Sequence, residues 1–163
     1  GGLLLLGGKR DRTATRHHSM SLVIEHRITI ATPPGAIYPI YVDVANWHRW
    51  DPDTKAATLS GPFAVGSRGT LTPAKGNTVP MVVTFADRAR GFTVESRIPL
   101  LLRMVFEHEL IARGPAETEV IHRVTLSGPL SWLIGPALRR QLDAGLPVTL
   151  GRLKRMAETG SPD

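Results

Sequence analysis

The stretch Trp132–Glu158, WLIGPALRRQLDAGLPVTLGRLKRMAE, decides the fold that we expect for this chain. Its apolar side chains recur at helical spacing, and most of its charged side chains occupy the opposite face. The pattern predicts one long amphipathic helix, which has to bury its apolar stripe against another element. The stripe comprises Ile134, Leu138, Leu142, Leu146, Leu150, Leu153 and Ala157.

The residues before this helix predict a sheet. Apolar and polar side chains alternate in Leu22–Ala31, as in a half-buried strand. Pro33 and Pro34 then favour a first short helix, and a second short helix is expected to carry Trp47 and Trp50. Short turns rich in glycine and proline separate the later strands, which favours antiparallel hairpins. These strands are expected at Lys55–Ser60, Ser67–Pro73, Thr78–Ala86, Gly91–Pro99, Leu101–Arg113 and Glu117–Ser127.

A sheet with one apolar face and a long apolar helix must bury against each other. We therefore predict an α+β fold, in which a curved seven-stranded antiparallel sheet surrounds the long C-terminal helix and two short helices follow the first strand. A helix lying across a strongly curved sheet leaves room for an internal cavity.

Composition excludes several kinds of chemistry. The chain has 163 residues and no cysteine, which rules out disulfides, thiolate metal sites and cysteine nucleophiles. Its net charge of +6 comes without basic runs interleaved with aromatic residues, so we expect no nucleic-acid partner. The lack of cysteine leaves the compartment open, and we expect a cytoplasmic protein.

Residues 1–20 read as a leader that does not belong to the domain. Their apolar run, Leu3–Leu6, is shorter than the roughly 7–15 residues of a secretory signal and the about 20 of a membrane span. Met20 follows like a natural start. We expect one domain over residues 21–163 and no stable membrane insertion.

Histidines are the most informative polar residues of the predicted inner face. His26, His108 and His122 each fall in the apolar phase of a predicted strand. A hairpin whose loop is residues 114–116 pairs Arg113 with Glu117 and places His108 opposite His122. The imidazoles are then either hydrogen-bonded core residues, ligand contacts, or ligands of a zinc ion. The zinc site is the least favoured, because no inward carboxylate supports it, and we predict no metal.

Three segments carry a resemblance to a known family. They are Val42–Pro52 (VDVANWHRWDP), Leu59–Pro73 (LSGPFAVGSRGTLTP) and Leu126–Glu158, the last strand running into the helix. Over residues 22–158 the chain resembles the helix-grip fold of the SRPBCC superfamily, its polyketide cyclase/dehydrase-like branch in particular. The resemblance implies that the first strand lies beside the last, so that His26 joins the same face. It does not choose among cyclases, lipid carriers, hormone receptors and co-chaperones.

We interpret the chain as a protein that binds a small apolar or lipid-like molecule between the sheet and the C-terminal helix. One alternative is a cyclase or dehydratase of an aromatic or polyketide-like substrate, with His108 or His122 as acid or base. Another is a co-chaperone-like interaction module with a solid core. Catalytic triads, phosphate loops and dinucleotide fingerprints are absent from the sequence, so no catalytic residue or cofactor is assigned. The predicted ligand-binding residues are Trp50, Met81, Phe85, Phe106, His108, His122, His26, Leu138 and Leu142.

Overall fold

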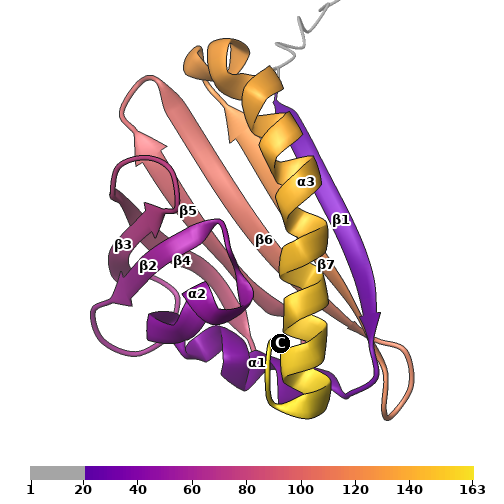
Figure 1. Ribbon diagram of the computed structural model, residues 1–163. Coiled ribbons are helices and arrows are strands. Elements are labelled where there is room, and N and C mark those ends of the chain that lie inside the picture. Colours follow the sequence, from indigo (N-terminus) through magenta and orange to yellow (C-terminus); the bar gives the residue numbers. More distant parts are fainter. Residues whose placement is uncertain (1–20) are drawn as a thin grey trace, which may run out of the picture.

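The computed structural model describes residues 21–163, and the leader predicted at residues 1–20 lies outside this range. The described residues form one sheet, a group of short helices after the first strand, and one long helix at the end (Figure 1). In chain order the elements are β1 (Leu22–Ile30), α1 (Pro34–Val42), the 3-10 turn η1 (Val44–Asn46), α2 (Trp47–Trp50), β2 (Thr54–Leu59), β3 (Arg68–Pro73), β4 (Val79–Asp87), β5 (Gly91–Ile98), β6 (Leu102–Ala112), β7 (Thr118–Ser127) and α3 (Leu130–Thr159).

Within residues 21–163 the strands form one seven-stranded antiparallel sheet in the order β1-β7-β6-β5-β4-β3-β2. The sheet curls around α3, which runs across its concave face, while α1 and α2 lie beside one end of that helix (Figure 1). The predicted α+β helix-grip architecture is confirmed. None of the helices in this part of the chain combines the length and apolar character needed to cross a bilayer.

The β6–β7 hairpin has the predicted register. The Arg113 amide donates to the Glu117 carbonyl at 2.8 Å, and His108 stands opposite His122. On the other side of β7, His26 of β1 also stands opposite His122. The three histidines therefore occupy one row across three neighbouring strands. Because side chains alternate between faces along each strand, this register also fixes which residues face α3.

The fourth strand departs from simple alternation at a β-bulge. Val83 pairs with Val94 and Phe85 pairs with Thr93, so Thr84 is an extra residue on β4. An extra residue shifts the side-chain phase by one. Ala86 therefore takes the inward position opposite Phe92, and Phe85 turns to the outer face. The prediction that Phe85 shares the inward phase of Met81 is wrong for this reason.

Helix α3 packs on the sheet along the predicted stripe. Leu150 and Leu153 are 1% and 0% exposed and belong to an apolar core that includes α1 and α2. Leu142 and Leu146 belong to a second cluster with Ile24 and Val124 of the sheet. The C-terminal half of the helix thus meets a filled core, whereas its N-terminal half faces mainly strand side chains.

The tight packing of the C-terminal half of α3 leads to a prediction about stability. Replacing Leu153 by Ala removes fully buried methyl groups and is expected to lower the free energy of unfolding by about 2–5 kcal/mol. Val148 on the same helix is 47% exposed, so Val148→Ala should change the free energy of unfolding by less than about 0.5 kcal/mol. Urea unfolding followed by circular dichroism measures both. Equal effects of the two substitutions would contradict the placement of α3.

Candidate ligand-binding cavity

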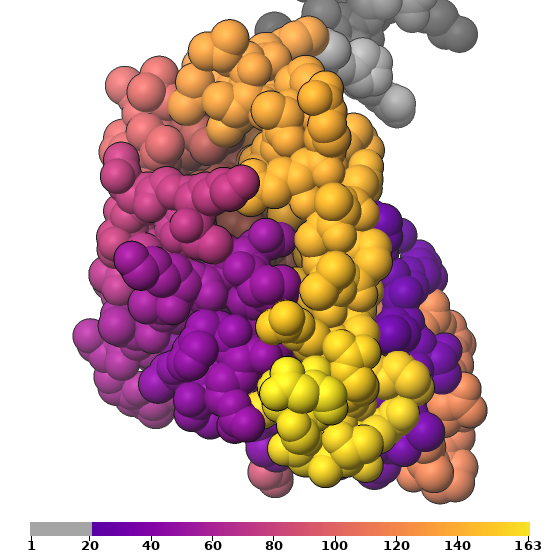
Figure 2. Space-filling model, in the orientation of Figure 1, coloured from indigo at the N-terminus to yellow at the C-terminus, as the bar shows by residue number. Residues whose placement is uncertain are grey.

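A cavity of about 310 Å³ lies between α3 and the concave face of the sheet. In the space-filling view a hollow opens between the first half of α3 and the strands opposite it (Figure 2). Most of the lining is apolar, and the polar groups come chiefly from the α2 region, His108, His122 and one side of α3. Its side chains include Trp47, Trp50, Asp51, Asp53, Leu71, Val79, Val94, Leu102, Met104, Phe106, His108, His122, Val124, Ile134, Leu138, Gln141, Leu142, Leu146 and Thr149.

The position of the cavity follows from the two apolar clusters. Helices α1 and α2 fill the space between the sheet and the C-terminal half of α3, with Tyr41, Trp47 and Trp50 all buried. No helix fills the corresponding space beneath residues 134–146 in the described part of the chain. The side chains of this part of α3 and of the strands opposite therefore line the space without filling it.

Two neutral imidazoles and a tyrosine meet at the inner end of the cavity. The hydroxyl of Tyr41, from α1, is hydrogen-bonded to His122 Nε2 at 2.9 Å. The His108 and His122 rings lie edge to face, with centroids 4.6 Å apart. His108 in turn stacks flat on Phe92, with centroids 4.0 Å apart. Both imidazoles are thus packed against neighbouring rings. Because Tyr41 is bonded to Nε2 of His122, Nδ1 is the nitrogen of that ring for a further partner.

Burial keeps these groups uncharged. It lowers the pKa of His108 to about 3. Burial, with a smaller contribution from His108, also holds the pKa of His122 well below its ordinary value of 6.5. The pKa of the Tyr41 hydroxyl is raised by burial as well. At neutral pH these three side chains therefore offer neutral donors and acceptors, while the lysine among the lining residues, Lys75, lies in the β3–β4 turn.

Two carboxyl groups, those of Asp51 and Asp53, also line the cavity. Asp51 accepts hydrogen bonds from Thr149 on α3 at 3.0 Å, from the Thr54 hydroxyl at 2.7 Å and from the Asp53 amide at 3.0 Å. Burial raises its pKa although these hydrogen bonds act to lower it. The pKa of Asp53 is raised by burial first and by the Asp51 charge second. Asp51 thus ties the start of β2 to α3.

Gly145 is the point at which α3 approaches Asp53. A Cβ atom at this position would collide with Asp53 Oδ2. That oxygen is buried and has no hydrogen-bond partner in the described part of the chain, as is true of Trp50 Nε1, Ser96 Oγ and His108 Nδ1. Buried polar atoms without partners are uncommon in folded proteins, and each one costs roughly 1–3 kcal/mol. Three of the four side chains line the cavity, so the unpartnered groups concentrate around it.

Six of the nine sequence-predicted site residues line the cavity. They are Trp50, Phe106, His108, His122, Leu138 and Leu142. Met81 faces inward but is 2% exposed in the apolar core with Trp47 and Val83, where no space remains. Phe85 lies on the outer face because of the β-bulge. Ligand binding by these residues stays a prediction.

His26 has a different partner from the other two histidines. Its Nε2 lies 2.8 Å from Asp143 Oδ1 on α3, at a partly exposed position along the edge strand. The sequence pattern placed Asp143 on the polar face of the helix, and it missed this contact. Since His26 pairs with Asp143, it does not line the cavity. Among residues 21–163 no group of three histidine or acidic side chains is arranged to hold a metal ion.

Sequence reasoning missed three residues that shape the site. Tyr41 lies on a nine-residue helix with little amphipathic pattern, so nothing in the sequence indicates that it reaches His122. Asp51 directly follows α2, and the hydrogen bond that it accepts from Thr149 joins positions 98 apart. Only the regular spacing of Thr149 beside Leu146 and Leu150 signalled its inward position.

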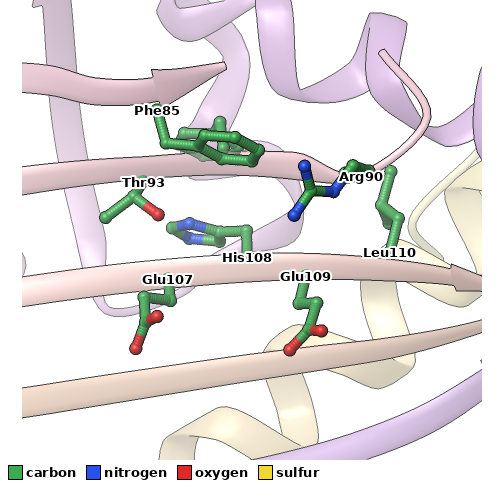
Figure 3. Close-up of a pocket in the computed structure, with 8 residues that line it drawn as sticks. Phe85, Arg90, Thr93, Glu107, His108, Glu109 and Leu110 are labelled. Carbon is green, nitrogen blue, oxygen red and sulfur yellow. The ribbon is translucent and has the colours of Figure 1, made fainter. Parts of the chain in front are cut away.

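The outer face of the sheet carries a separate depression (Figure 3). Phe85, Thr93, Glu107 and Glu109 surround it, and the Arg90 guanidinium lies 5.3 Å from the Phe85 ring centre. Glu107 and Glu109 take part in ion pairs with Arg123 on the next strand. This arrangement is typical of a solvated, charged sheet surface, and it holds no buried group without a partner other than the inward His108.

Solved structures with the same fold include functionally different proteins. An aromatase/cyclase from Streptomyces sp. R1128 superposes with a TM-score of 0.67 at 16% identity, covering 86% of this chain and 98% of its own. Truncated norcoclaurine synthase from Thalictrum flavum superposes with a TM-score of 0.67 at 12% identity, covering 86% of this chain and 95% of its own. A protein from Deinococcus radiodurans superposes with a TM-score of 0.60 at 22% identity, covering 85% of this chain and 98% of its own. At these identities the likeness concerns the fold.

The sequence itself identifies the family. No match was found among curated proteins. The sequence profile of one family, described as polyketide cyclase / dehydrase and lipid transport, matches residues 21–158, nearly the whole of the described chain. The profile spans β1 to the last turn of α3 and includes every element that lines the cavity. The chain therefore belongs to the polyketide cyclase / dehydrase and lipid transport family, and its fold is a ligand-binding one.

Proposed function

We propose that the protein binds one small, mostly apolar molecule in the cavity between the sheet and α3, with a hydroxyl or carbonyl group of that molecule directed at His122. The observation that carries this proposal is the combination of an apolar cavity of about 310 Å³ with neutral imidazoles at its inner end. Apolar walls supply the burial energy and a few polar groups supply orientation. We also propose a cytoplasmic location, which suits a chain without cysteine.

The chemistry of the polar end favours a neutral ligand group. His122 is uncharged at neutral pH because burial lowers its pKa, and its Nε2 is already bonded to Tyr41. A hydroxyl or carbonyl can complete the hydrogen bonding of Nδ1 without introducing a buried charge. An anionic group at this end would be buried beside imidazoles that stay uncharged and cannot neutralise it, which disfavours it.

Cyclisation or dehydration of the bound molecule is a second candidate. The observation that favours it is the raised pKa of both Asp51 and Asp53, carboxyl groups that line the cavity and hold a proton more readily than exposed ones. Two solved structures with this fold, an aromatase/cyclase and a norcoclaurine synthase, are named as enzymes and support this candidate. The two imidazoles are weaker candidates for the acid or base, because their low pKa makes them poor bases. A co-chaperone-like role, which requires a solid core, is not supported by the cavity.

A cavity-filling substitution tests the binding proposal. Leu138→Trp adds an indole to the cavity lining and should weaken binding of the probe 2-naphthol at least about tenfold, because the probe and the new side chain compete for the same volume. Val148→Trp is the matched control, since Val148 is 47% exposed on the same helix. Isothermal titration calorimetry measures both affinities. A wild-type protein that does not bind 2-naphthol, or equal affinity in both variants, would contradict a ligand-binding cavity.

The role of the imidazoles is tested by comparing two probes of one shape. Wild-type protein should prefer 2-naphthol over 2-methylnaphthalene by about tenfold, the value of one buried hydrogen bond near 1.4 kcal/mol. The double variant His108→Leu/His122→Leu should lose this preference while it still binds 2-methylnaphthalene. If the preference survives in the double variant, the histidines only fill the core and another group recognises the hydroxyl.

Neutral burial of the two histidines predicts an acid-sensitive fold. In the unfolded chain they titrate near 6.5, whereas in the folded protein the pKa of His108 is about 3 and that of His122 is also lowered. The unfolded state therefore binds more protons below pH 6.5, and stability falls as pH falls through this window by up to about 1.4 kcal/mol per pH unit for each histidine. Urea unfolding at pH 7 and pH 5 measures the loss. The His108→Leu/His122→Leu variant should show a clearly smaller loss, and an identical one would show that other groups cause it.

A further inference from the structure

Large apolar side chains gather in solvent where the β5–β6 turn meets the start of α3, at the upper end of the molecule in Figure 1. Leu100 and Leu101 of the turn are 96% and 48% exposed, and Trp132 and Leu133 in the first turn of α3 are 63% and 79% exposed. Single exposed apolar residues are ordinary, but a group of four from two segments marks an interaction surface. We name these four side chains the apolar tip.

The two segments of the apolar tip are fixed to each other. The Leu130 amide donates to the Leu101 carbonyl at 3.0 Å, and Gly128 packs so closely on that carbonyl that a Cβ atom would come within 2.6 Å of it. Leu100 has a φ of 64°, in the left-handed region that a leucine rarely adopts. The backbone thus holds an apolar side chain out in solvent at some conformational cost, where a glycine would fit without strain.

The two segments that carry the apolar tip are rich in arginine. Residues 96–104 and 127–141 contain Arg97, Arg103, Arg139 and Arg140 and no aspartate or glutamate. Glu95 pairs with both Arg97 and Arg103, which leaves that trio with a net positive charge. Arg139 donates to the Val23 carbonyl from an exposed position. Exposed tryptophan and leucine with arginines on the same two segments are features that favour the interface of a membrane with anionic lipids.

We propose that the apolar tip docks the protein reversibly on the surface of an anionic phospholipid membrane. Trp132, Leu133 and Leu100 enter the boundary between headgroups and acyl chains, and the arginines lie at the level of the phosphates. Protruding side chains such as Leu100, 96% exposed at the apex of a turn, suit a soft lipid surface better than a flat protein interface. Surface docking requires no spanning helix, in keeping with the helices of residues 21–163.

The apolar tip adjoins one end of the cavity. The side chains that follow it along the same two segments, Leu102, Met104, Ile134 and Leu138, line the cavity. Docking therefore brings this end of the cavity next to the bilayer, where an apolar molecule can exchange without crossing bulk water. This use rests on the proposed function, whereas docking itself is independent of what the cavity binds.

The experiment is co-sedimentation of the full chain with large unilamellar vesicles, without any cavity ligand. Wild-type protein should bind vesicles of phosphatidylcholine with phosphatidylserine, more weakly at high salt and on phosphatidylcholine alone. Trp132→Ser/Leu133→Ser should lower the partition coefficient at least about tenfold. Leu100→Gly should lower it severalfold while the melting temperature stays the same or rises, because glycine relieves the left-handed φ. Val65→Ser is the matched control: Val65 is 65% exposed in the β2–β3 loop, and its loss should leave vesicle binding unchanged.

Several outcomes would overturn the proposal. One is a wild-type protein that does not bind the anionic vesicles while it binds 2-naphthol, which would leave the proposed function standing. Another is a Trp132→Ser/Leu133→Ser variant that folds and binds vesicles as the wild type does. A Leu3→Ser/Leu4→Ser/Leu5→Ser/Leu6→Ser variant that loses vesicle binding, while the apolar-tip variants retain it, would assign docking to the N-terminal segment. Light scattering that shows a dimer lost only in the apolar-tip variants, without vesicle binding, would assign the surface to a second copy of the chain.

Discussion

The single register that joins β5, β6, β7 and β1 determines the chemistry of both faces of the sheet. On the inner face it aligns Phe92, His108, His122 and His26 in one row. One residue along, the outer face carries Glu107, Arg123 and Glu25, which form ion pairs across the strands. A slip of one residue would exchange the rows, placing charges under α3 and apolar side chains in water. Each exposed apolar side chain would cost about 1.5–3 kcal/mol, so this register is strongly favoured.

Given that register, the helices decide how the space under the sheet is used. Tyr41 and Trp50 reach across from α1 and α2 and complete the core at one end. The bonds from Asp51 to Thr149 and Thr54 hold these short helices against α3. The cavity begins where this filling stops. The same contacts that stabilise the core therefore set the position of the polar groups in the cavity.

The polar groups around the cavity are not the arrangement that stability alone would favour. Two buried imidazoles carry lowered pKa values, and His108 Nδ1, Trp50 Nε1 and Asp53 Oδ2 have no hydrogen-bond partner within residues 21–163. Aliphatic side chains of similar size would remove these costs. Such groups are expected where a bound molecule supplies the missing hydrogen bonds, as the proposed function requires. The side chains next to the apolar tip line the other end of the same cavity, so the proposed docking surface and the imidazoles lie at opposite ends of it.

The sequence by itself determined the strands, the antiparallel order, the long helix and the pairing of His108 with His122, because these follow from local periodicity and from a short loop between neighbouring strands. It also identified the family, through segments spread over residues 22–158. Only the tertiary structure decided the outward turn of Phe85, since one extra residue at Thr84 reverses a phase that the composition of β4 does not reveal. The contacts of Tyr41 with His122, Thr149 with Asp51 and Asp143 with His26 were likewise beyond the sequence. Each joins residues far apart in the chain, and the distance between them is set by how the whole sheet curves around α3, which no local pattern encodes.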